Sequence, residues 1–98
     1  MSDPDIPNHG ARVRFDFVQG DDTEARYRVQ LLVGEAVHEG DVTIGDGGRD
    51  IVIDTIEPAA PEWLTGVVRS FARQIGVGRK KDDGRWPRRV TRWRAPKA

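Results

Sequence analysis

The chain has 98 residues, enough for one domain with a modest core, and its 16 basic and 16 acidic side chains leave no net charge. It contains no cysteine, which excludes a disulfide framework, a thiolate nucleophile and a sulfur-ligated metal site. No apolar run approaches the roughly 20 residues that span a bilayer, and residues 1–10 lack a signal-peptide pattern, so we expect a soluble cytoplasmic protein without a membrane partner.

Residues 1–10 are polar and show no periodicity, so we expect a flexible leader before a single α+β domain at residues 11–78. Apolar and polar residues alternate along residues 11–17 and again along residues 26–33, on either side of the turn-forming segment QGDDTE. Alternation is typical of strands with one buried face. The pattern therefore predicts two antiparallel strands joined as a hairpin.

A short third strand is expected at residues 41–44, entered by a turn at Glu39 and Gly40 that also holds His38. The run GDGG at residues 45–48 predicts a hairpin turn, because glycine accepts the positive φ angles of tight turns. The apolar residues 51–53 then form a fourth strand.

Two prolines end the sheet region, and Pro61 suits the first turn of a helix. We expect this helix at residues 61–75, with Gly76 as its C-cap and an apolar stripe that packs on one sheet face: Leu64, Val67, Val68, Phe71 and Ile75. Residues 90–94 form either a fifth strand or a tail that orders on binding. The predicted fold is α+β, an antiparallel sheet of four or five strands with one helix on one face, in the order β-β-β-β-α with or without a final C-terminal strand.

Charge is segregated along the chain. Residues 1–65 hold fourteen acidic groups against five arginines, whereas residues 66–98 hold eleven basic groups against two aspartates. The C-terminal segment, residues 79–98, also contains two of the three tryptophans. Guanidinium groups neutralise phosphates and indole rings stack on bases, so this composition predicts binding of DNA or RNA. The predicted contact residues of the segment are Arg79, Lys80, Lys81, Arg85, Trp86, Arg88, Arg89, Arg92, Trp93 and Arg94.

Four further arginines extend this predicted site. Strand alternation places them on the sheet face away from the helix: Arg12, Arg14, Arg26 and Arg28. They either add to a basic binding face or pair with carboxylates on neighbouring strands. Trp86 and Trp93 have an alternative interpretation as well, in which they close the core and Trp93 packs near the helix.

No catalytic, metal-binding or cofactor motif is evident. The two histidines, His9 and His38, are not predicted to meet, and the cluster of His38, Glu39 and Asp41 is expected to form a solvated turn. We therefore expect a non-catalytic module without cofactor or metal. Nucleic-acid binding is the leading hypothesis; the alternative is a protein-protein interaction or dimerisation module whose basic segment docks on an acidic surface of a partner or of a second copy.

Overall fold

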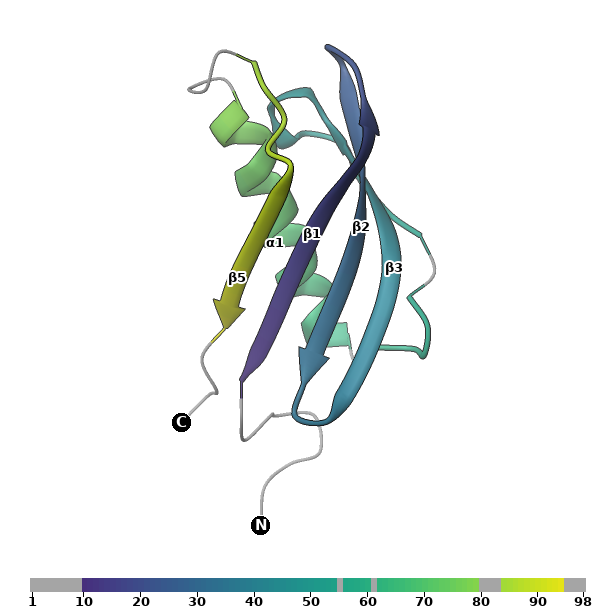
Figure 1. Ribbon diagram of the computed structural model, residues 1–98. Helices are drawn as coiled ribbons and strands as arrows, with labels where there is room; N and C mark the ends of the chain where they lie inside the picture. Colours follow the sequence, from purple (N-terminus) through teal and green to yellow (C-terminus); the bar gives the residue numbers. More distant parts are fainter. Residues whose placement is uncertain (1–9, 55, 61, 80–83, 95–98) are drawn as a thin grey trace.

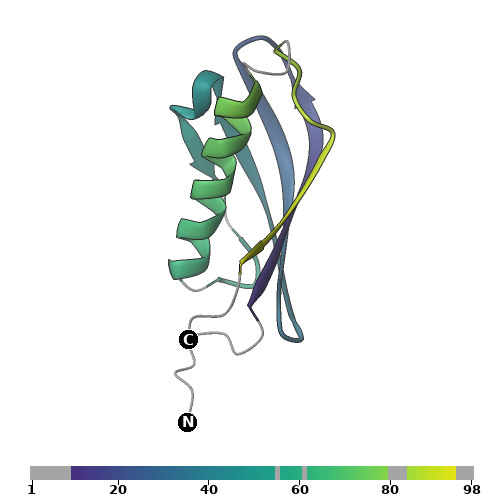
Figure 2. The same ribbon diagram turned by 90° about the vertical axis from the view of Figure 1, so that its left-hand side faces the viewer.

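The computed structural model describes residues 10–54, 56–60, 62–79 and 84–94. Five antiparallel strands form one sheet in the order β4-β3-β2-β1-β5, and a single helix covers one face of it (Figures 1 and 2). The elements are β1 (Ala11–Gly20), β2 (Glu24–Val33), β3 (Ala36–Gly45), the 3-10 turn η1 (Asp46–Gly48), β4 (Ile51–Ile53), α1 (Glu62–Arg79) and β5 (Arg89–Arg94). The α+β prediction is confirmed, with the fifth strand present. The expected leader, apart from Gly10, lies outside the described residues.

The β1–β2 hairpin follows the predicted alternation. Val13, Phe15 and Tyr27 are fully buried, and their polar neighbours lie on the opposite face, which we call the outer face. The turn is held by Asp21, whose Oδ1 accepts hydrogen bonds from the backbone N–H of Thr23 and of Glu24. This arrangement is an Asx-type turn, in which a short carboxylate replaces a backbone acceptor. The register of the hairpin thus fixes which side chains the outer face presents.

The third strand is much longer than residues 41–44, and the predicted turn at Glu39 and Gly40 is wrong. β3 starts at Ala36, and the tight turn lies just before it, at Gly34, whose φ of 58° favours glycine. His38 is buried inside the strand and donates from Nδ1 to the carbonyl oxygen of Pro58 at 2.7 Å. His38 is a polar residue on the buried face, so it interrupts the apolar alternation expected of this strand. Its hydrogen-bond partner, Pro58, is 20 residues further along the chain, so neighbouring residues gave no sign that His38 would be buried.

The GDGG run connects β3 to β4 as predicted, but the expected end of the helix at Gly76 is wrong. α1 continues to Arg79, and Gly76 is buried where the helix meets η1. A Cβ atom at this position would lie 2.4 Å from the backbone nitrogen of Gly48. Gly76 is therefore a close-packing residue that lets η1 touch the helix, and it does not cap the helix. The buried stripe consists of Leu64, Val68, Ala72 and Ile75, with Val67 and Phe71 partly buried beside it.

This contact predicts opposite effects for alanine at two helical glycines. Gly76→Ala should lower the free energy of unfolding by about 1–3 kcal/mol, because backbone must move to admit the methyl group. Gly66→Ala, at a position where the added Cβ meets nothing within 4 Å beyond its chain neighbours and the helix's own backbone, should raise it by about 0.5–1 kcal/mol. Urea denaturation followed by tryptophan fluorescence measures both. A stabilising Gly76→Ala would contradict the proposed packing.

Candidate nucleic-acid interface

The basic strand β5 pairs antiparallel with β1, and this register decides where its side chains lie. Trp93 is opposite Arg12, Thr91 is opposite Arg14, and Arg89 is opposite Asp16. Side chains of directly opposed residues share one face of a sheet. Trp93 therefore lies on the outer face, where it is 57% exposed. The interpretation that Trp93 packs near the helix is wrong, because the helix lies on the other side of the sheet (Figure 2).

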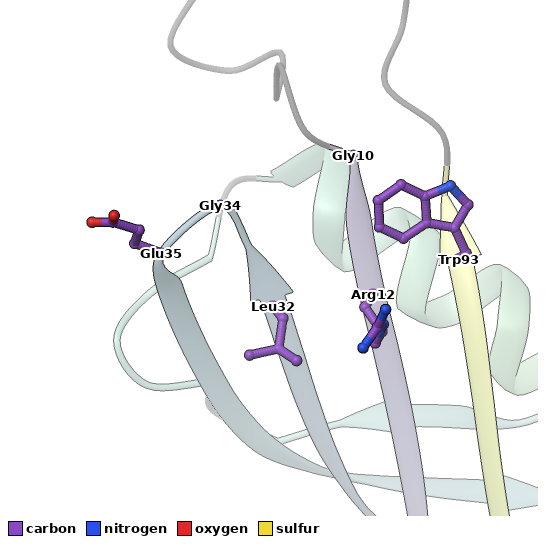
Figure 3. Close-up of a pocket in the computed structure, with 6 residues that line it drawn as sticks. All are labelled: Gly10, Arg12, Leu32, Gly34, Glu35 and Trp93. Atoms are coloured by element: carbon purple, nitrogen blue, oxygen red, sulfur yellow. The ribbon is translucent and has the colours of Figure 1, made fainter.

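Trp93 borders a shallow depression of about 490 Å³ at one end of the outer face. Figure 3 shows Trp93, Arg12 and Leu32 beside one another on three adjacent strands, with Glu35 on the far rim and pointing away. Register extends this row to Val37 on β3, which is 44% exposed. Leu32 and Val37 were not among the residues predicted from the sequence. Alternation along β2 could have placed Leu32 on the outer face, two residues after Gln30. Val37 gave no such signal, because it lay outside the predicted third strand at residues 41–44.

Most of the arginines predicted on the outer face form ion pairs with carboxylates, which agrees with the interpretation that they pair across the sheet rather than form a basic binding face. The ion pairs join Arg14 and Arg89 to Asp16 at 2.8 and 2.7 Å, Arg26 to Asp41 at 3.1 Å, and Arg28 to Glu39 at 3.1 Å. Hydrogen bonds from Arg14 and Arg89 lower the pKa of Asp16. Exposed pairs of this kind stabilise a fold only weakly, because solvent screens the two charges. Their main effect is to neutralise much of the positive charge on this face.

Four arginines differ from these. None of the described carboxylates forms an ion pair with Arg12, Arg85, Arg88 or Arg92. Arg12 lies in the depression beside Trp93, whereas Arg92, opposite Val13 on β1, is exposed on the other face of the edge strand. Arg85 and Arg88 line a second depression, of about 340 Å³, together with Trp86. Among the predicted contact arginines whose side chains are described, these four have no ion pair with a described carboxylate.

Arg79 was predicted as a contact residue, but its side chain lies inside the fold. It is only 7% exposed. Its Nε donates to the carbonyl oxygen of Gly84 at 2.7 Å and its Nη1 to that of Asp22 at 2.8 Å. The guanidinium carbon lies 4.3 Å from the centre of the Trp86 ring, a cation–π contact. Arg79 thus joins the end of α1 to the β1–β2 turn and to the segment that leads into β5.

Trp86 belongs to the same cluster and is half-buried. Its indole Nε1 donates to the carbonyl oxygen of Asp21 at 2.7 Å, and its ring meets that of Tyr27 edge-on at 6.5 Å between centroids. The Tyr27 hydroxyl donates to the carbonyl oxygen of Pro87 at 2.7 Å, and burial raises the pKa of this phenol. These contacts make Trp86 an anchor for the segment before β5, which leaves Trp93 as the exposed ring of the two.

The remaining predicted residues are less informative. Lys80 and Lys81 lie outside the described residues, and Arg94 ends β5 opposite Ala11.

His38, Glu39 and Asp41 do not form the expected solvated turn, because they lie in β3 with His38 on the buried face. Within the described ranges no group of three or more potential ligands is arranged to hold a metal ion.

Comparisons with known proteins provide no guide to function. No protein-family model matches the chain, and no curated protein or solved structure matches it significantly. Within the described part of the chain, no helix is long and apolar enough to cross a membrane. Function is therefore inferred from the residues themselves.

The arrangement predicts that Arg79 contributes to stability. Arg79→Met should lower the free energy of unfolding by about 2 kcal/mol, because hydrogen bonds from a charged group to two carbonyls are lost. Arg73→Met, an exposed position on the same helix, should change it by less than about 0.5 kcal/mol. Urea denaturation compares the two variants. Equal effects would mean that Arg79 does not hold these segments together.

Proposed function

We propose that this protein is a small non-catalytic module that binds single-stranded nucleic acid on the outer face of its sheet. The observation that carries the proposal is the exposed indole of Trp93 beside Arg12, which no described carboxylate neutralises. An aromatic ring on an open sheet surface offers a platform for an unpaired base, and a neighbouring guanidinium offers a contact for its phosphate.

The geometry favours a single strand over a duplex. Stacking on an indole requires a base that is free of its own neighbours, and bases in a duplex are already stacked. Stacking of this kind contributes about 1–3 kcal/mol per base and depends little on base identity. The module is therefore expected to discriminate weakly among sequences.

The proposed contact set is smaller than the fourteen residues predicted from the sequence. It is centred on Trp93 and Arg12, which share the outer face. Arg92 lies on the other face of β5, and Arg85 and Arg88 line the second depression beside Trp86, so these three contribute less. The paired arginines contribute less, because a phosphate must compete with a carboxylate already in place. With one or two phosphate contacts on a single strand, the logarithm of affinity should fall with the logarithm of salt at a slope of about −1.

A second candidate function is docking of another protein with an acidic surface. The observation that favours it is the row of Trp93, Arg12, Leu32 and Val37, which combines exposed apolar area with a cation. Tryptophan and arginine are enriched at the energetic centres of protein interfaces. The two functions use the same surface and differ in their ligand.

The test is fluorescence anisotropy with a labelled single strand of about twelve nucleotides at low salt. Trp93→Ala should weaken binding about 10- to 100-fold, while Trp93→Phe should retain most of it because a phenyl ring still stacks. Arg12→Ala should weaken binding severalfold. Arg26→Ala is the matched control, since Arg26 is paired with Asp41, and should have an effect below about twofold.

Failure of the wild-type protein to bind single-stranded DNA and RNA at low salt would overturn the proposal. Binding that Trp93→Ala leaves unchanged would also do so. Capture of a polyglutamate peptide in a Trp93-dependent manner, without affinity for the oligonucleotide, would select docking on an acidic protein.

A further inference from the structure

β5 is an edge strand, and one of its sides is unpaired within the described sheet. The sheet order places β1 on one side of β5 and no strand on the other. The opposite edge is formed by β4, which has three residues, whereas β5 has six. Unpaired edges expose backbone donors and acceptors that can pair with another strand. The longer free edge of this sheet is therefore the side of β5 that faces away from β1 (Figure 1).

The direction of the backbone groups along β5 follows from one hydrogen bond. The N–H of Phe17 donates to the carbonyl oxygen of Arg88 at 2.9 Å, so the backbone of residue 88 points toward β1. Because such bonding alternates along an antiparallel pair, Val90 and Arg92 also point toward β1. The N–H and C=O groups of residues 89, 91 and 93 consequently point to the free edge.

We propose that two copies of this chain pair antiparallel through this edge, with Thr91 on the two-fold axis. In this register Thr91 lies opposite the partner's Thr91, and Arg89 lies opposite the partner's Trp93. All three outward-pointing residues then exchange backbone hydrogen bonds with the second copy. The two sheets join into one continuous sheet, which is the isologous arrangement expected for a two-fold dimer.

The side chains are self-complementary in this register. Arg89, Thr91 and Trp93 share the outer face, because they lie opposite Asp16, Arg14 and Arg12 of β1, respectively. Threonine pairs directly opposite each other are favourable in sheets. Arg89 opposite the partner's Trp93 permits a cation–π contact on both sides of the axis. On the other face Val90 lies opposite the partner's Arg92, whose aliphatic stem can cover it.

Other registers are less favourable. A shift that centres the pair on Arg92 places two arginines directly opposite each other, and like charges at this spacing destabilise a sheet. A shift that centres it on Val90 moves Trp93 opposite the partner's Pro87, which has no N–H to donate. The Thr91-centred register keeps like charges away from the centre of the pair and places no proline within it. Its own like-charge pairs, Arg94 opposite the partner's Arg88, lie at the two ends, where Arg88 precedes β5.

This excess of arginine gives the dimer a distinctive response to salt. The two β5 strands repel each other electrostatically, and added salt screens that repulsion. Association through the edge should hold or strengthen between about 50 and 500 mM salt. A basic segment docked on an acidic surface of a second copy should instead dissociate over the same range. The proposal does not depend on nucleic-acid binding.

Analytical ultracentrifugation of the full chain, without nucleic acid, tests the pairing over about 10 µM to 1 mM protein. The wild type should show a concentration-dependent monomer–dimer equilibrium. Thr91→Pro removes the N–H that faces the free edge and leaves the β1 ladder intact, so it should weaken the dimer at least about tenfold. Thr91→Val, the matched control, keeps the donor and should change it less than about threefold. Circular dichroism verifies that each variant is folded.

The register is tested by isotope-filtered NMR on a mixed dimer of labelled and unlabelled chains. Contacts between the Trp93 ring of one copy and the Arg89 side chain of the other are expected. A wild type that stays monomeric up to millimolar concentration would overturn the proposal, as would a dimer that Thr91→Pro leaves unchanged. A dimer that dissociates on addition of salt would show that acidic docking, not edge pairing, joins the copies.

Discussion

The position of the C-terminal strand depends on the buried guanidinium of Arg79. This one group bonds the carbonyls of Asp22 and Gly84 and lies against the ring of Trp86, which is itself bonded to Asp21. The helix end, the β1–β2 turn and the approach to β5 are thereby joined at one point. A strand held at its beginning in this way enters the sheet with a defined register against β1, and that register brings Trp93 to the outer face.

The outer face combines two kinds of arginine. Those in its middle are paired with Asp16, Glu39 and Asp41 and stabilise the sheet modestly through cross-strand ion pairs. Arg12 stands apart from them, between Trp93 and Leu32. The positive charge of this face is therefore localised, because carboxylates neutralise part of it and leave an aromatic ring and a cation together at one end of the sheet.

Much of the fold follows from local patterns, since alternation along β1 and β2 and helical periodicity along α1 each involve neighbouring residues. The errors arose where a residue's role depends on a distant partner. His38 lies buried in a strand because Pro58 accepts its hydrogen bond, and Gly76 continues the helix because Gly48 packs against it. In the candidate site, alternation predicted the face on which Arg12 lies. The buried role of Arg79 was not predictable, because it bonds a residue 57 positions earlier in the sequence.

The central claim is that Trp93, and not the anchored Trp86, is the ring that meets a ligand. The chain has three tryptophans, so their indole N–H resonances form a small set of probes in a nitrogen-15 NMR titration. On addition of a short single-stranded oligonucleotide at low salt, the Trp93 resonance should shift progressively while those of Trp86 and Trp63 stay in place. A shift of Trp86 without one of Trp93, or no shift of any indole, would contradict the account.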